Sequence, residues 1–108
     1  MSKEEKQTNT PRYLKEREKF QEPYLYDVLL HNDDVTTMDF VVVLLMRIFH
    51  RPESDAISIM LKVHKEGVGI AGTYPYDIAL TKCHHGRTFA RANNFPLILT
   101  VEPSSSDQ

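Results

Sequence analysis

Three groups of side chains in this 108-residue chain could do chemistry, and the first is its only cysteine, Cys83, which is followed by His84 and His85. Successive helical residues point about 100° apart, so the two imidazoles cannot both face the thiol. A zinc site would need more Cys or His in register, and the chain has no C-x-x-C or H-x-x-x-H spacing. Motifs of serine hydrolases and of phosphate-binding glycine loops are also missing. We therefore expect a small buried cysteine between surface histidines, with no metal, no cofactor and no enzyme activity.

The second group is the run Asn32-Asp33-Asp34-Val35-Thr36, and the third is His64. Asn and Asp satisfy their own backbone in turns, so a simple turn before a helix is one interpretation of the run. His64 follows Ile57 and Met60 at helical spacing, so we expect its imidazole to be embedded among apolar side chains. An amide and carboxylate turn together with a buried histidine could line one pocket.

The composition limits what elements can position these groups. With 41% hydrophobic and 26% charged residues, the chain has the composition of one ordinary globular domain. A net charge of −2 gives no electrostatic case for nucleic acid or an anionic membrane. The longest apolar run, Phe40–Met46, is far shorter than the ~20 residues that span a bilayer. A single cysteine and an N-terminus without a signal-peptide pattern favour a cytoplasmic protein.

The charged residues divide the chain into three parts. Residues Met1–Pro23 hold six Lys/Arg and five Asp/Glu, a net charge of +1, with few large apolar side chains. Such a segment cannot offset its ordering entropy, so we expect a flexible extension over residues 1–23. Residues Tyr24–Glu102 are expected to form the folded domain, and Pro103–Gln108 a frayed tail.

Hydrophobic periodicity, helix caps and turn residues predict six elements between Tyr24 and Glu102. They are a strand over 24–31, a helix over 40–49 with Thr36 and Asp39 as a capping box, a helix from Pro52 that stops at Gly67, a Gly-interrupted strand with a bulge over 68–74, a helix from Pro75 to about Asn93, and a strand over 97–102. The order β-α-α-β-α-β predicts an α+β fold in which a three-stranded sheet packs on helices.

Several short stretches resemble one family in both order and spacing. They are Asn32-Asp33-Asp34-x-Thr36-x-Met38-x-Phe40-Val41, Met60-Leu61-x-Val63-His64-x-x-Gly67, Gly72, Lys82, and Ala90-Arg91 before Pro96-Leu97. This pattern is similar to ClpS, the adaptor family that delivers N-degron substrates to a Clp ATPase–protease. The resemblance implies antiparallel strands packed on three helices, as in the C-terminal domain of the ribosomal stalk protein.

The resemblance also implies a function and a site. A ClpS-like chain binds proteins whose first residue is Phe, Tyr, Trp or Leu. The residues that match the family's amino-group site are Asn32, Asp33, Asp34 and His64. Those that match its hydrophobic pocket are Thr36, Met38, Val41, Met60, Val63 and Leu97. Which of the two aspartates faces the amino group stays open, because successive turn residues point different ways.

A second surface of the family binds the N-terminal domain of the Clp ATPase, and Asp77 and Lys82 match it. Leu80 stands where an acidic residue is expected, and Thr37 replaces a common proline, so the choice between a ClpA-type and a ClpC-type partner stays open. We expect a monomer that binds N-degron proteins and the ATPase, without nucleic acid or membrane. The alternative is a ribosome-associated interaction domain with the stalk-protein fold.

Overall fold

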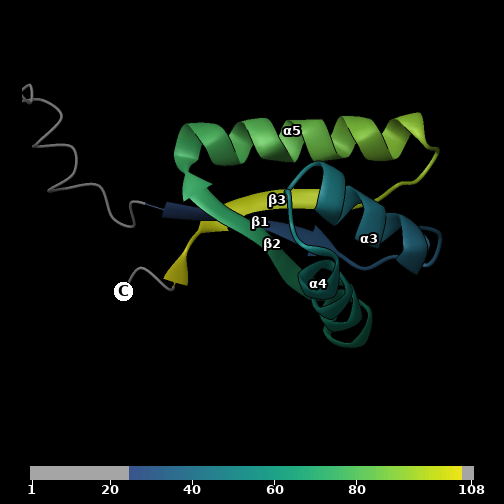
Figure 1. The fold of residues 1–108 in the computed structure, drawn as a ribbon. Coiled ribbons are helices and arrows are strands. Elements are labelled where there is room, and N and C mark those ends of the chain that lie inside the picture. The colour runs from purple at the N-terminus through teal and green to yellow at the C-terminus, as the bar shows by residue number, and fades with distance from the viewer. Residues whose placement is uncertain (1–24, 106–108) are drawn as a thin grey trace, which may run out of the picture.

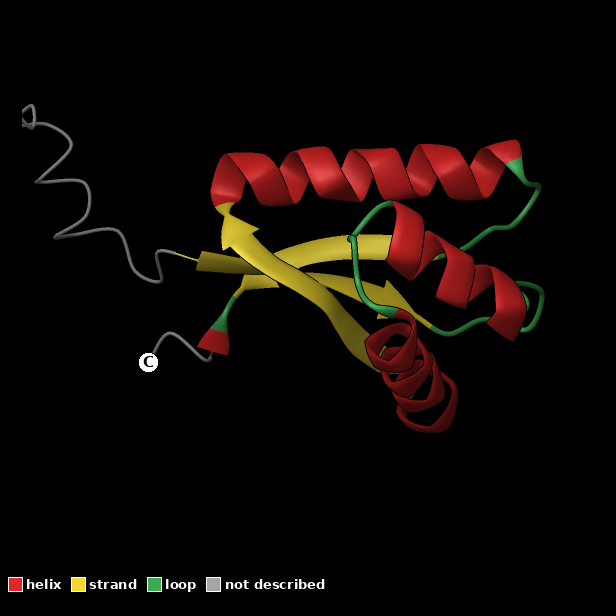
Figure 2. Cartoon of the chain, in the orientation of Figure 1, coloured by secondary structure: helices red, strands yellow, loops and turns green. Residues whose placement is uncertain are grey.

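A computed structural model describes residues 25–105 (Figure 1), so the expected extension over residues 1–23 lies outside the described residues. The elements are β1 (Leu25–His31), α3 (Met38–Arg47), α4 (Glu53–Glu66), β2 (Val68–Pro75), α5 (Tyr76–Ala92) and β3 (Ile98–Pro103). Their order confirms the α+β fold expected from the sequence. In Figure 2, α5 runs along the sheet, α3 lies beside α5, and α4 sits at the β2 edge of the sheet.

The sheet has the order β2-β1-β3, and both pairings are antiparallel. The antiparallel arrangement implied by the resemblance is therefore confirmed. Val28 pairs with Gly72 but Leu29 pairs with Ile70, so the register shifts and Ala71 is the extra residue of a β-bulge. The bulge predicted from the spacing of glycines is present in β2.

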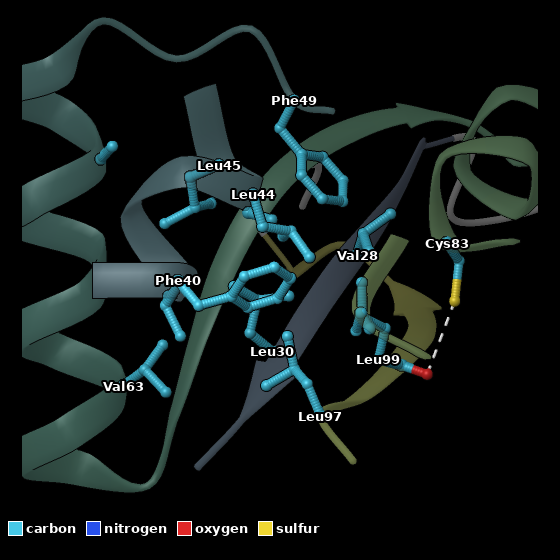
Figure 3. Packing of buried hydrophobic residues seen from close by; sticks show 14 of the residues in the cluster. Val28, Leu30, Phe40, Leu44, Leu45, Phe49, Val63, Cys83, Leu97 and Leu99 are labelled. Atoms are coloured by element: carbon cyan, nitrogen blue, oxygen red, sulfur yellow. Dashed lines mark hydrogen bonds between the residues drawn. The ribbon is translucent and has the colours of Figure 1, made fainter. Parts of the chain in front are cut away.

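The hydrophobic core lies between the sheet and the helices (Figure 3). Val28 and Leu30 of β1 have no exposed surface, nor do Leu44 and Leu45 of α3. Burying one such side chain stabilises the fold by about 1.5–3 kcal/mol. Gly86 lets α5 approach β3, since a Cβ there would lie 2.6 Å from the Leu99 Cδ2 atom. The core thus fixes α3, α5 and the sheet relative to one another.

The largest difference from the predicted helices is at α3, which spans Met38–Arg47 rather than 40–49 and has a different N-cap. Thr37, not Thr36, is the N-cap of α3, and its side chain accepts a hydrogen bond of 3.1 Å from the Phe40 N–H. The capping box over Thr36 and Asp39 is therefore wrong by one residue, because Thr36 is held by Asp33 instead. Gly67 ends α4 in the left-handed region at φ 91°, as predicted.

Ordered backbone continues past Glu102 at the C-terminal end. Strand β3 runs to Pro103, and the Ser104 N–H donates to the Leu25 carbonyl over 2.9 Å. Ser104 is buried. The antiparallel pairing of β3 with β1 therefore extends to the first residues of β1, while residues 106–108 of the expected tail lie outside the described part.

Candidate functional site

The loop between β1 and α3 is organised by the Asp33 carboxylate. Its Oδ1 accepts hydrogen bonds from the Val35 and Thr36 N–H groups at 2.8 and 2.7 Å, and its Oδ2 accepts from the Thr36 hydroxyl at 2.7 Å. Partial burial would raise the pKa of Asp33, but these hydrogen bonds and the nearby charge of Arg91 lower it below the ordinary 3.8. Asp33 is therefore ionised, and both of its carboxylate oxygens accept hydrogen bonds from within the loop.

The neighbouring polar side chains of the loop are available to a ligand. Asn32 and Asp34 are exposed, and neither side chain makes a hydrogen bond or ion pair within residues 25–105. The Asn32 backbone is nevertheless anchored, because its N–H donates to the Gly67 carbonyl over 2.9 Å. This bond joins the loop to the end of α4.

His64 lies in the last turn of α4, next to that junction, and is exposed. The expectation that its imidazole is embedded among apolar side chains is wrong. The buried residues of α4 are Ala56 and Val63, whereas Ile57 and Leu61 are about 40% exposed, so the core face is turned by roughly one residue from the expected one. The imidazole therefore reaches solvent at the same end of the fold as the Asn32 side chain.

The residues expected to line a hydrophobic pocket range from fully buried to exposed. Val41, Val63 and Leu97 are buried members of the core cluster, and Met60 packs against it half-buried. Figure 3 shows Val63 and Leu97 at the end of the core where Phe40 lies. Thr36 is half-buried, and Met38, the first residue of α3, is 46% exposed. Three of the six expected pocket residues are therefore closed within the core, and Thr36, Met38 and Met60 are the ones that reach solvent.

Arg91, for which the sequence predicts no role, holds the segment before β3. Its Nη1 donates to the carbonyls of Phe95 and Leu97 at 3.1 and 2.7 Å, and its charge lowers the pKa of Asp33. The signal available in the sequence was a basic residue in the last turn of the predicted helix, two residues before Asn93. Arg91 links α5, the segment before β3 and the Asp33 loop.

Replacing Arg91 by alanine is expected to lower the free energy of unfolding by about 1–3 kcal/mol, because the Leu97 carbonyl loses a charge-assisted donor. Urea unfolding followed by circular dichroism measures the change. Arg47→Ala is the matched control, since Arg47 is exposed at the end of α3 and bonds no described residue. Equal stability of the two variants would contradict the role of Arg91.

The two residues expected to dock a partner lie on the first half of α5 but differ in their surroundings. Asp77 is exposed in the first turn. Lys82 is half-buried, its Nζ donates to the Ile48 carbonyl over 2.9 Å, and it lies 6.0 Å from the centre of the Tyr74 ring. Lys82 therefore holds the end of α3 to α5, and two of its three ammonium protons stay available.

Cys83 has the environment of a structural thiol. It is 5% exposed, with its Sγ 3.5 Å from the Leu99 carbonyl and 3.5 Å from Arg87 Nη2. Burial raises the pKa of the thiol despite the favourable charge of Arg87, so a reactive thiolate is disfavoured. His84 and His85 are exposed, as expected.

The described residues were also searched for metal-binding clusters and for helices that could span a membrane. No group of three or more His, Cys, Asp or Glu side chains in this range is placed to hold a metal ion. Among the same residues, no helix combines the length and apolar character needed to cross a bilayer.

Comparison with known proteins identifies the family of this chain. The family model of ATP-dependent Clp protease adaptor protein ClpS matches residues 21–100. Curated ClpS adapter proteins of Clostridium acetobutylicum and Syntrophus aciditrophicus are 47% and 54% identical, covering 82% and 79% of this chain and 87% and 79% of their own lengths.

A solved structure is also similar. It is the Agrobacterium tumefaciens ClpS2 bound to L-phenylalaninamide, with a TM-score of 0.72 and 35% identity over 76% of this chain and 99% of that one. Members of the matched family are adaptors rather than enzymes. The chain therefore belongs to the ClpS family, the adaptor proteins of the ATP-dependent Clp protease.

Proposed function

We propose that this adaptor binds proteins whose first residue is Phe, Tyr, Trp or Leu and delivers them to the Clp ATPase for degradation. The observation that carries the proposal is the arrangement at the end of β1. The Asn32 and Asp34 side chains there are exposed and unpaired, and the Asn32 N–H bonds the carbonyl of Gly67, three residues after the exposed His64. The ClpS2 relative was solved with L-phenylalaninamide, which carries both a free amino group and a phenyl ring.

The amino group of such a substrate calls for the acceptors that this loop offers. A free α-amino group is mostly an ammonium ion at neutral pH, with three donors and a positive charge. The Asn32 carbonyl oxygen and a neutral His64 ring nitrogen would accept two of these protons. Asp34, which is exposed and bonds no described residue, would supply negative charge.

The same acceptors would discriminate against internal peptide segments. A backbone amide inside a chain has one donor and no charge, so it would leave two acceptors without partners. Unmatched polar groups at a partly desolvated site cost about 1–3 kcal/mol each. The mismatch would therefore restrict binding to the chain terminus, in the way that a missing hydrogen bond sharpens selectivity in other sites.

The side chain of the first residue would rest against the expected pocket residues. Met60 and the Thr36 methyl group would give it partly exposed apolar surface, backed by the buried Val41, Val63 and Leu97. Met38 lies at the edge, where its bulk would crowd a branched β-carbon and so disfavour Val and Ile. A misfit of one methylene is worth only ~1–3 kcal/mol, whereas burying a charge costs far more.

Delivery would use surfaces apart from this pocket. Asp77 is free on the first turn of α5, and Lys82 retains two donors, so both could meet the N-terminal domain of a ClpA-type or ClpC-type ATPase. The chain would act as a monomer in the cytoplasm. We infer that residues 1–23 would enter the ATPase channel during hand-over, because a segment with few large apolar side chains is suited to be engaged there.

Fluorescence anisotropy with labelled peptides that differ only in their first residue tests the proposal. We expect Phe, Tyr, Trp and Leu peptides to bind, Val and Ile peptides to bind about 10-fold more weakly or worse, and Lys or Asp peptides not to bind measurably. The N-acetylated Phe peptide is the control, because it keeps the side chain and loses the ammonium. Equal affinity for the free and the acetylated peptide would refute the proposed site.

A further inference from the structure

A groove with a volume of about 440 Å³ lies between the C-terminal end of α3 and the second half of α5. It is lined by Ile48, His84, His85, Thr88, Phe89 and Ala92. None of these residues has a part in the proposed N-degron site. Met38, which belongs to that site, and Ile48 are separated by about 15 Å along α3. The groove can therefore be occupied while the N-degron site holds a substrate.

Both walls of the groove are held in place by the fold. The Phe89 ring stacks on Phe40 with ring centres 5.3 Å apart. On the other side, the Ile48 N–H donates to the Leu44 carbonyl over 2.8 Å, and the Ile48 carbonyl accepts from Lys82 Nζ over 2.9 Å. The groove is thus preformed, and its volume falls within the ~300–1,000 Å³ of ordinary ligand sites.

Three sides of α5 already make contacts within the fold. The residues buried on its core side are Ala79, Cys83, Gly86 and Ala90. On one flank, Arg87 and Arg91 donate to carbonyls around the start of β3. On the opposite flank, Lys82 and Phe89 contact α3 and its C-terminal end. The groove borders this second flank and opens onto the remaining side of α5, which faces solvent.

Both residues expected to dock a partner are in line with residues of the groove. Successive helical residues point about 100° apart, so positions seven or eleven residues apart differ in direction by only about 20°. Lys82 is therefore in line with Phe89, and Asp77 with Thr88. Lys82 also bonds the carbonyl of Ile48, which lines the groove. The groove thus continues the expected docking surface along α5.

The lining of the groove suits an uncharged, apolar side chain. Ile48 and Phe89 are half-buried, and Ala92 adds a methyl group. Among the described residues, no Lys, Arg, Asp or Glu lines the groove, and the imidazoles of His84 and His85 are mostly uncharged at neutral pH. A side chain such as Leu, Met or Phe therefore leaves water there without burying a charge.

We propose that this groove is the apolar part of the ATPase docking surface and receives one bulky apolar side chain of the Clp ATPase between Ile48 and Phe89. The proposal rests on the proposed docking through Asp77 and Lys82, and membership of the adaptor family of the ATP-dependent Clp protease supplies the partner. Protein interfaces commonly combine a buried apolar anchor with a polar rim, and here Asp77 and Lys82 form the rim. Because the N-degron site stays free, the adaptor holds substrate and ATPase together.

Isothermal titration calorimetry of the full chain against the purified Clp ATPase tests the proposal. Thr88→Lys places a charge in the groove and Ala92→Trp fills it, and both residues are exposed on α5. We expect each variant to weaken ATPase binding at least ~10-fold, as loss of an apolar anchor does, and to keep its affinity for a Phe-initiated peptide within about 2-fold. Ser58→Lys is the matched control, because it replaces an exposed hydroxyl residue within α4, and it should retain ATPase affinity. Urea unfolding verifies that the variants are as stable as the control.

Unchanged ATPase affinity in both Thr88→Lys and Ala92→Trp would overturn the proposal. Asp77→Ala separates that result from a failure of the proposed function: if it alone weakens the complex, docking stands without the groove, and if the chain binds no ATPase at all, both fail. A loss that vanishes when residues 2–20 are deleted would assign the groove to the chain's own N-terminal segment. Self-association that Ala92→Trp abolishes would assign it to a second copy of the chain. Either of these two results also overturns the proposal.

Discussion

Replacing Asn32 or His64 by alanine is expected to weaken binding of a Phe-initiated peptide about 10- to 100-fold for each variant, without unfolding the domain. Each change removes one acceptor for a charged donor, and hydrogen bonds to charged groups contribute about 1.5–3 kcal/mol. Both side chains are exposed and bond no other described residue, so the fold loses little. Fluorescence anisotropy measures affinity, and urea unfolding measures stability.

Matched controls exist on α5. His84→Ala removes an exposed imidazole far along the chain from the loop, and Asn93→Ala removes an amide whose Nδ2 bonds only the Phe89 carbonyl in its own helix. Both should retain the affinity of the unchanged chain for the Phe-initiated peptide. Wild-type affinity in the Asn32→Ala and His64→Ala variants would remove these residues from the amino-group site.

The same titration separates the two aspartates. Asp34→Asn should weaken peptide binding by about 10-fold with unchanged stability, because it removes a negative charge that no described residue uses. Asp33→Asn should lower stability as well, because a neutral amide accepts less strongly from the two N–H groups and the Thr36 hydroxyl. If Asp33→Asn alone reduced affinity while Asp34→Asn did not, the assignment of Asp34 would be wrong.

Local sequence patterns predicted most of the fold, because residues within or next to each helix and strand indicate where it begins, ends or bends. Gly67 stops α4 where a left-handed residue is needed, Pro52 precedes its first turn, and the glycines of β2 accompany a bulge. Antiparallel pairing is a tertiary property, and only the family resemblance supplied it. The N-cap differed by one residue because Thr36 and Thr37 are equally good caps locally, and the Asp33 carboxylate decides between them.

The parts of the site that the sequence could not resolve depend on the direction of side chains. The rotation of α4 about its axis relative to the core exposes His64, although helical spacing alone assigned His64 to the same apolar face as Met60. The direction of the Lys82 side chain was also not predictable from spacing. Lys82 matches a docking residue by resemblance, but its ammonium also bonds the end of α3. Periodicity identifies a helix and its approximate apolar face, but an error of one residue turns a side chain by about 100°.

Deleting Ser2–Phe20 is expected to leave the affinity for a Phe-initiated peptide within about 2-fold while abolishing degradation of a Phe-initiated protein by the Clp ATPase–protease. Every proposed pocket residue lies between Asn32 and Leu97, so the deletion removes no contact to the first residue of the substrate. Residues 1–23 have few large apolar side chains, which suits a segment that a translocating ATPase engages rather than one that packs on the domain.

The measurement is made in two assays with one protein preparation: anisotropy for binding, and loss of a fluorescent Phe-initiated substrate in the presence of the ATPase, the protease and ATP. Replacing Ser2–Phe20 by a Gly- and Ser-rich segment of equal length is the matched control, because it keeps reach and removes side chains. If length alone is needed, this variant delivers substrate and the deletion does not. Delivery by the deletion variant itself would show that recognition and docking by the folded domain suffice, and that residues 2–20 take no part in hand-over.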